Sequence, residues 1–260
     1  MEPSPAPWIS ALRHSHDTLQ AAVEPLDSGR LEELSYASEW SIAQVLSHLG
    51  SQAEIFWMFL DAGLNGQDAP GPEAFGPIWD TWNAKSPQAQ ASDSLRADLA
   101  TLERFESLDA DEQARLRLHA FGMDLGAADI ARMRLGEHAI HAWDILVALD
   151  PEATVAPDAV ALLVDQLDQL VGRTAKPDGK ERKIRVSTSD PERQFILETG
   201  DAVTLKADDE GTPELGLSEL RLPAEAFVRL IYGRLDEAHT PPVENAGVEL
   251  DELRQIFPGF

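Results

Sequence analysis

The sequence of 260 residues contains no cysteine. The chain therefore cannot form a disulfide bond, a thiolate zinc site, an iron–sulfur cluster or a cysteine nucleophile. Any metal ion must be held by histidine, aspartate or glutamate. Any thiol chemistry needs a thiol that is supplied from outside the protein.

Positive charge is also scarce. Lysine and arginine total 21 against 46 aspartates and glutamates, which gives a formal net charge of -25 and a pI near 4.4. A surface this acidic repels phosphate backbones and anionic lipid headgroups, so we expect neither nucleic acid nor a membrane as a partner. Arginine outnumbers lysine and alanine is abundant, which is typical of a GC-rich genome.

Long apolar runs are missing as well. No segment reaches the roughly 18 apolar residues of a transmembrane helix. The first residues, MEPSPAPWIS, lack the basic region and apolar core of a secretory signal, so we expect a cytoplasmic protein. Hydrophobic residues nevertheless make up 43% of the chain, which is enough for an ordinary globular core.

The apolar spacing changes character along the chain. In the first half it predicts four helices with polar connectors and loops between them, at 8–23, 41–60, 87–108 and 127–149. Ser41 and Gln44 form a capping box at the start of the second helix, whereas 63–76 and 121–126 are predicted to be loops. The second half predicts further helices at 158–171, 224–234 and 248–257, and strands at 183–188, 194–199, 202–207 and 216–222. We therefore expect an α+β protein with a helical domain at 1–152 and a smaller α+β domain at 153–260.

Candidate metal ligands lie on the fourth of these helices. Glu137 and His141 are four residues apart, which at about 100° per residue places both side chains on one face. Asp144 is three residues further along the same face, where its carboxylate can accept a hydrogen bond from the imidazole nitrogen that does not bind the metal. His48, in the apolar stretch VLSHLGSQAEIFW, is the best candidate for a third ligand, with His138 as an alternative that points about 100° away from Glu137.

Each of these residues also has a plain structural interpretation. A glutamate four residues before a histidine is often a surface pair, and a lone histidine in an apolar stretch is often a hydrogen-bonded core residue. His14 and His16, on the first helix, are expected to be solvated.

Three segments share their pattern with a known family. They are SEWSIAQVLSHLGSQAEIFW (38–57), RLGEHAIHAWDIL (134–146) and LRLPAEAFVRLIYGRLDE (220–237), in this order. In this arrangement the chain resembles the mycothiol-dependent maleylpyruvate isomerases, a branch of the DinB-like metalloenzymes that occurs in actinobacteria. The resemblance implies an N-terminal four-helix bundle and a small, sterol-carrier-like C-terminal domain.

The resemblance also implies a site and a reaction. The family's metal ligands fall on His48, Glu137 and His141, and this donor set suits Zn²⁺ best among divalent ions. The implied cosubstrate is mycothiol, whose thiolate adds to the cis double bond of maleylpyruvate so that the carbon–carbon bond can rotate before elimination. An enzyme of this kind binds a small-molecule substrate and takes its sulfur from that cosubstrate, consistent with the absence of cysteine.

A dianionic substrate requires local positive charge. Arg134, one turn before Glu137, is a candidate for a substrate carboxylate or else for a helix-surface salt bridge. Arg234 is the candidate from the C-terminal segment, with Arg229 as an alternative; an arginine there can also neutralise its helix C-terminus.

Other reactions fit the same site. The family is broad, and the net charge of -25 disfavours a small dianion. A mycothiol S-transferase acting on an electrophilic compound is the nearest alternative. A metal or small-molecule binding module without catalysis and a hydrolase that uses metal-bound water are the others. The sequence does not indicate an oligomeric state.

Overall fold

The computed structural model describes residues 3–37, 39–208, 211 and 217–259. The chain divides into two compact units, Met1–Ala159 and Val160–Phe260. Each unit has its own buried apolar residues.

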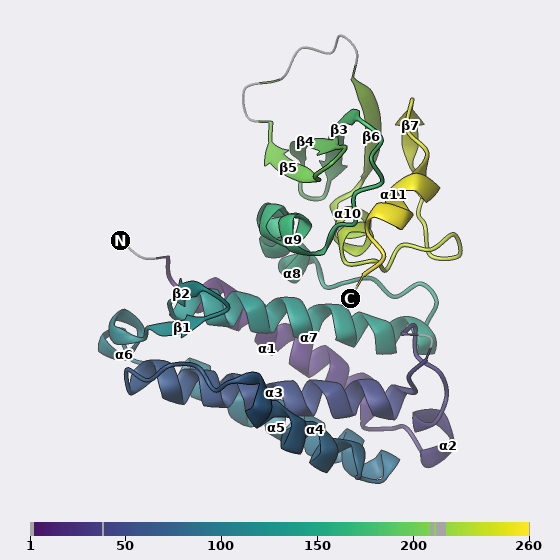
Figure 1. Cartoon of the computed structure of the whole chain (residues 1–260). Helices are drawn as coiled ribbons and strands as arrows, with labels where there is room; N and C mark the ends of the chain where they lie inside the picture. The colour runs from purple at the N-terminus through teal and green to yellow at the C-terminus, as the bar shows by residue number, and fades with distance from the viewer. Residues whose placement is uncertain (1–2, 38, 209–210, 212–216, 260) are drawn as a thin grey trace. The chain divides into compact units, whose positions relative to one another are not determined.

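Four long helices make up most of the first unit (Figure 1). They are α1 (Ala6–Val23), α3 (Ile42–Leu64), α5 (Pro87–Glu106) and α7 (Ala127–Leu149). Helices α1 and α3 each pack against both α5 and α7. All four follow the apolar spacing of the sequence, and the capping box of Ser41 and Gln44 is present at the start of α3.

Shorter elements connect the long helices. They are α2 (Ser28–Leu31), η1 (Pro72–Ala74), α4 (Phe75–Asn83), α6 (Ala110–Arg115), and the hairpin strands β1 (Leu118–Ala120) and β2 (Met123–Leu125). Helix α8 (Pro157–Leu163) follows α7 in the sequence and includes the residues at which the two units meet along the chain. The sequence predicted loops at 63–76 and 121–126 and did not predict α4 or the hairpin. The predicted loop ended at Gly76, which instead lies in the first turn of α4; Pro77 follows in the same turn, where proline is tolerated because the amide it lacks would have no helical partner.

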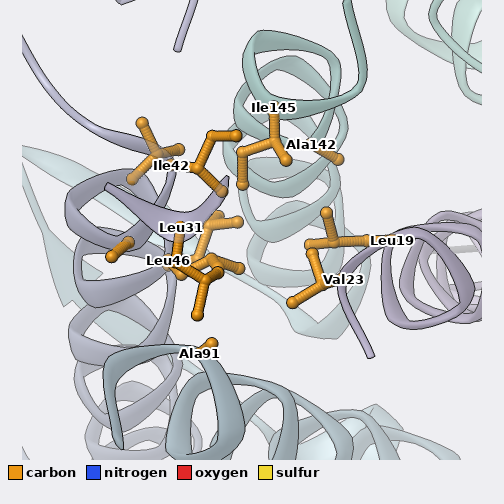
Figure 2. Close-up of a cluster of buried hydrophobic side chains, with 11 residues drawn as sticks. Leu19, Val23, Leu31, Ile42, Leu46, Ala91, Ala142 and Ile145 are labelled. Carbon is orange, nitrogen blue, oxygen red and sulfur yellow. The ribbon is translucent and has the colours of Figure 1, made fainter. Parts of the chain in front are cut away.

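A cluster of buried hydrophobic side chains lies at one end of the four helices (Figure 2). Leu19 and Val23 of α1 meet Ile42 and Leu46 of α3, together with Ile145 of α7. Their burial removes apolar surface from water, which is worth about 25 cal/mol per Å². The packing fixes α3 and α7, the two helices that carry the candidate ligands, to each other.

The second unit is a five-stranded sheet with helices. Its strands are β3 (Arg182–Ser189), β4 (Arg193–Thr199), β5 (Thr204–Ala207), β6 (Ser218–Pro223) and β7 (Glu244–Ala246), in the order β5-β4-β3-β6-β7. Among the described strands of this sheet, the β3–β6 pair alone is parallel. The helical elements of this unit are η2 (Val164–Gln166), α9 (Leu167–Thr174), α10 (Ala224–Ile231) and α11 (Leu250–Ile256). The expected mixture of a helical half and a smaller α+β half is confirmed.

Two details differ from the sequence prediction. The helix expected at 158–171 is divided into α8, η2 and α9, because a 3-10 turn keeps nearly the same apolar spacing as an α-helix. Strand β7 was not predicted. The predicted strand at 216–222 begins at Gly216, which lies outside the described residues, and β6 covers the rest. Within the described part of the chain, no helix is long and apolar enough to cross a membrane.

Candidate metal centre

His48, Glu137 and His141 converge in the first unit. The Nε2 atom of His48 lies 3.3 Å from Oε2 of Glu137, and Nε2 of His141 lies 3.7 Å from the same oxygen. One ligand atom from each residue lies within 4.8 Å of the other two. The rings of His48 and His141 meet edge to face at 4.6 Å. Two imidazole nitrogens and a carboxylate oxygen at this separation could hold one divalent ion and leave coordination positions open.

Asp144 fixes the orientation of His141. Its Oδ2 lies 2.9 Å from Nδ1 of His141, and the side chain of Asp144 has no exposed surface. The ring therefore donates its Nδ1 hydrogen to the carboxylate, which leaves the Nε2 lone pair facing Glu137. A carboxylate behind a ligating imidazole sets its tautomer and raises its basicity.

The charges at the centre favour the deprotonated forms of its ligands. Burial alone would raise the pKa of Glu137, but the hydrogen bond from His48 and the positive charges of His141, His48 and Arg134 lower it to about 2. The pKa of His48 is lowered by burial and by the charges of His141 and Arg134, against the hydrogen bond to Glu137. Near neutral pH, Glu137 is thus a carboxylate and His48 a neutral imidazole, the forms that bind metal.

A pocket opens beside His48. Its volume is about 620 Å³, which falls within the range of about 300–1,000 Å³ that is typical of small-ligand sites. It is lined by Trp40, Gln44, His48, Ser51, Gln52, Trp79, Asn83 and Gln90. Trp40 also packs against the ring of His48, with centroids 5.5 Å apart. Amide groups and indole faces make this pocket suited to a neutral, hydroxyl-rich ligand.

A second polar cluster lies inside the first unit. Oδ2 of Asp98, on α5, lies 2.7 Å from Nδ1 of His16 and 2.9 Å from Nε2 of His138. Nδ1 of His138 also lies 2.8 Å from Oγ of Ser15. By distance alone His16, Asp98 and His138 could hold a metal ion. Arg134, however, binds the same carboxylate, and a divalent ion beside a buried guanidinium would add uncompensated positive charge.

The sequence prediction for His16 was wrong. We expected it to be solvated, but its side chain is only 1% exposed. Its position four residues after Leu12 and three before Leu19 places it on the buried face of α1, and this spacing was the available signal. His14, by contrast, is exposed as expected.

Arg134 lies in this buried cluster. Its side chain has no exposed surface, and Nη2 donates to Oδ1 of Asp98 at 2.6 Å and to the carbonyl oxygen of Leu49 at 3.2 Å. The guanidinium therefore presents no surface to a ligand arriving from solvent, and it forms an internal ion pair instead of a surface one.

The two C-terminal arginines belong to the second unit. Arg229 is bound through Nε and Nη2 to Glu225 and through Nη1 to the carbonyl oxygens of Arg234 and His239, so its side chain is fully engaged. Nη1 of Arg234 donates to the carbonyl oxygen of Tyr232.

Comparisons with known proteins agree with this architecture. Two solved structures of a mycothiol-dependent maleylpyruvate isomerase resemble the chain. A histidine-to-alanine mutant of that enzyme has a TM-score of 0.68 and 15% identity, and the match covers 95% of each chain. The other structure has a TM-score of 0.65 and 16% identity, and the match covers 92% of this chain and 95% of the isomerase chain. At this identity the likeness shows the fold. A comparison with curated proteins gave no match.

A family assignment rests on sequence. Residues 12–146, more than half of the chain, match the family described as the mycothiol maleylpyruvate isomerase N-terminal domain. The matched range contains His48, Glu137, His141 and Asp144, and it includes all of α3 and α5 and most of α1 and α7. The chain belongs to the mycothiol maleylpyruvate isomerase N-terminal domain family.

Proposed function

We propose that this protein is a metal-dependent enzyme that uses mycothiol as a thiolate nucleophile to isomerise a maleylpyruvate-like cis-alkene. The observation that carries the proposal is the convergence of His48, Glu137 and His141 within 4.8 Å, in a chain whose family is named for this chemistry. The absence of cysteine supports it, because the sulfur must come from a cosubstrate.

The donor set fits a bound Zn²⁺. Both histidines can present nitrogen lone pairs, Glu137 is ionised, and Asp144 already holds His141 in the required tautomer. When bound, the ion would lower the pKa of a thiol so that the thiolate is available near neutral pH. A four-helix bundle of the DinB-like type, with a sterol-carrier-like second domain, is the architecture we propose around this site.

The chain's own residues would position the two reactants. Trp40 and Trp79 offer indole faces, and Gln44, Gln52 and Asn83 offer amide groups, to the hydroxyl-rich glycoside that carries the mycothiol thiol. Substrate binding would place the alkene against that thiol and exclude water from it.

The reaction itself conserves all atoms. The thiolate forms a carbon–sulfur bond at one alkene carbon and the electron pair of the double bond moves into the conjugated carbonyl. The remaining single bond rotates, and expulsion of the thiolate restores the double bond in the trans geometry. The thiol is regenerated, so no oxidant or reductant is consumed.

A dianionic substrate would need a cation. Arg234 is our proposed carboxylate-binding residue because the segment 220–237 resembles the family's C-terminal domain, whereas Arg134 is enclosed. The test is to replace Arg234 with methionine: KM for the dianion should rise while metal content stays unchanged.

Conjugation of mycothiol to an electrophile is the second candidate. It is favoured by one observation: no arginine or lysine occurs among the described residues that line the pocket beside His48. A neutral electrophile needs no such cation. Binding without catalysis and water-based hydrolysis remain further alternatives that a thiol-dependence assay separates from both proposals.

The experiment supplies the purified enzyme with maleylpyruvate, or with a neutral electrophilic alkene, in the presence and absence of mycothiol. Isomerisation that requires catalytic mycothiol supports the first candidate, and stoichiometric loss of mycothiol into an adduct supports the second. Turnover that does not change when mycothiol is removed contradicts both.

A further inference from the structure

Arg134 carries a buried positive charge close to the candidate metal centre. It lies one helical turn before Glu137 on α7, and side chains three residues apart on a helix are neighbours. Its Nη2 atom also donates to the carbonyl oxygen of Leu49, the residue that follows His48 on α3. Arg134 thus contacts the backbone beside one proposed ligand and precedes another by one turn.

Such a charge opposes a cation at the neighbouring site. Buried charges are screened less by water and salt than exposed ones, so the guanidinium acts on the neighbouring site. Arg134 is already among the groups whose positive charge acts on both His48 and Glu137. A negative charge that offsets Arg134, beyond the charge of Glu137 itself, therefore favours the binding of a divalent ion there.

Asp98 is placed to supply that charge. Its Oδ1 accepts from Nη2 of Arg134 at 2.6 Å, and its side chain is only 4% exposed. Among the described residues no other carboxylate pairs with Arg134, and the Nε and Nη1 atoms of the guanidinium have no hydrogen-bond partner there. Asp98 is held in turn by His16, so that the carboxylate is fixed from the side of α1 as well.

We propose that Asp98 is a positioning residue for the metal centre, which neutralises Arg134 and so permits a divalent cation to bind at His48, Glu137 and His141. This inference rests on the metal site of the proposed function. It gives Asp98 and Arg134 a joint electrostatic role at a site that neither residue touches as a ligand.

The test compares Zn²⁺ affinity in four forms of the full chain: wild type, Asp98→Asn, Arg134→Met and the double variant. Affinity is measured near neutral pH by competition with a chromophoric chelator, and the melting temperature of each metal-free form is recorded alongside. Asn keeps the size of Asp98 and removes its charge, and Met approximates the length of Arg134 without a charge.

The charge account predicts that Asp98→Asn weakens Zn²⁺ binding by about tenfold or more, because an unpaired buried cation then faces the ion. Adding Arg134→Met should restore affinity to within about threefold of wild type. Arg134→Met alone should bind Zn²⁺ at least as tightly as wild type, which keeps the test decisive if Asp98→Asn fails to fold.

Three results would overturn the inference: unchanged affinity in Asp98→Asn, a double variant as weak as Asp98→Asn, or weaker binding in Arg134→Met. Affinities that simply follow the melting temperatures would assign Asp98 a structural role instead. If wild type binds no Zn²⁺, the proposed function is wrong and the inference with it, whereas tight wild-type binding with any of the three results overturns the inference alone.

Discussion

Oδ2 of Asp144 lies 2.9 Å from Nδ1 of His141, one turn away on the same helix, and the carboxylate is fully buried. This hydrogen bond occupies Nδ1 of His141, so that Nε2 is the nitrogen that can bind a metal ion. The carboxylate is close enough to act on the imidazole but lies on the opposite side of the ring from Glu137.

Replacing Asp144 with asparagine should weaken metal binding without removing a ligand. Loss of a carboxylate behind a ligating histidine typically costs about tenfold to 100-fold in metal affinity. Chelator competition measures this, with Asp129→Asn on the first turn of α7 as the control. Equal Zn²⁺ affinity in Asp144→Asn and wild type would contradict the role given to Asp144.

Trp40 and Trp57 provide a matched test of the pocket. Trp40 lines the pocket and packs on His48, whereas Trp57, about equally exposed, is not among the residues that line it. Trp40→Ala should raise KM for mycothiol about tenfold, the effect of losing one aromatic contact of roughly 1–1.5 kcal/mol. Trp57→Ala should leave KM unchanged, and both variants should retain their metal. An equal effect of the two substitutions would contradict the assignment of the pocket.

Gly50 permits the close approach of α4 to α3. A Cβ atom at this position would lie 2.3 Å from the ring of Trp82, which is almost completely buried. Gly50→Ala should therefore destabilise the protein by about 1–3 kcal/mol, because the indole must move. Gly76→Ala, where nothing lies within 4 Å, is the control and should not be destabilising. Denaturant unfolding distinguishes these outcomes, and an unaffected Gly50→Ala protein would show that Trp82 is not held as described.

The decrease in the free energy of unfolding at acid pH should depend on Asp98. Burial alone would raise its pKa, but the charges of His138 and Arg134 and hydrogen bonds from His138 and His16 hold the pKa well below its ordinary value of 3.8. A carboxylate with a depressed folded-state pKa stabilises the protein above its unfolded-state pKa, and this stability is lost as the pH falls toward the folded-state value.

The free energy of unfolding of wild type should thus fall below about pH 4 with a slope that Asp98→Asn lacks, by up to about 1.4 kcal/mol per pH unit. Urea unfolding at a series of pH values gives both slopes. Parallel curves for the two proteins would show that Asp98 does not carry this pH dependence.

Local signals in the sequence were sufficient for the main elements. The capping box at Ser41 and Gln44 marks the start of α3, and helical spacing places Glu137, His141 and Asp144 along α7. These are interactions within one helix, for which residue spacing is direct evidence. His48 was selected from its apolar surroundings and the family pattern, and the structure brings it to 3.3 Å from Glu137.

The buried cluster around Asp98 was not predicted. In the sequence Asp98 is an ordinary polar residue of an amphipathic helix, and no local pattern indicates its contacts with Arg134 of α7 and His16 of α1. The sequence therefore predicted that Arg134 binds a substrate carboxylate or forms a salt bridge on the helix surface, and that His16 is solvated. In the structure both side chains are buried. The burial of a charged residue depends on a partner that only tertiary packing supplies.

The central claim is that His48, Glu137 and His141 hold a metal ion together. The most direct measurement is the metal content of purified wild-type protein and of His48→Ala, Glu137→Ala and His141→Ala, with the exposed His119→Ala as the matched control. We predict about one zinc per chain in wild type and His119→Ala, and loss of most of it in each of the three ligand variants. Full metal content in all three variants would contradict the account.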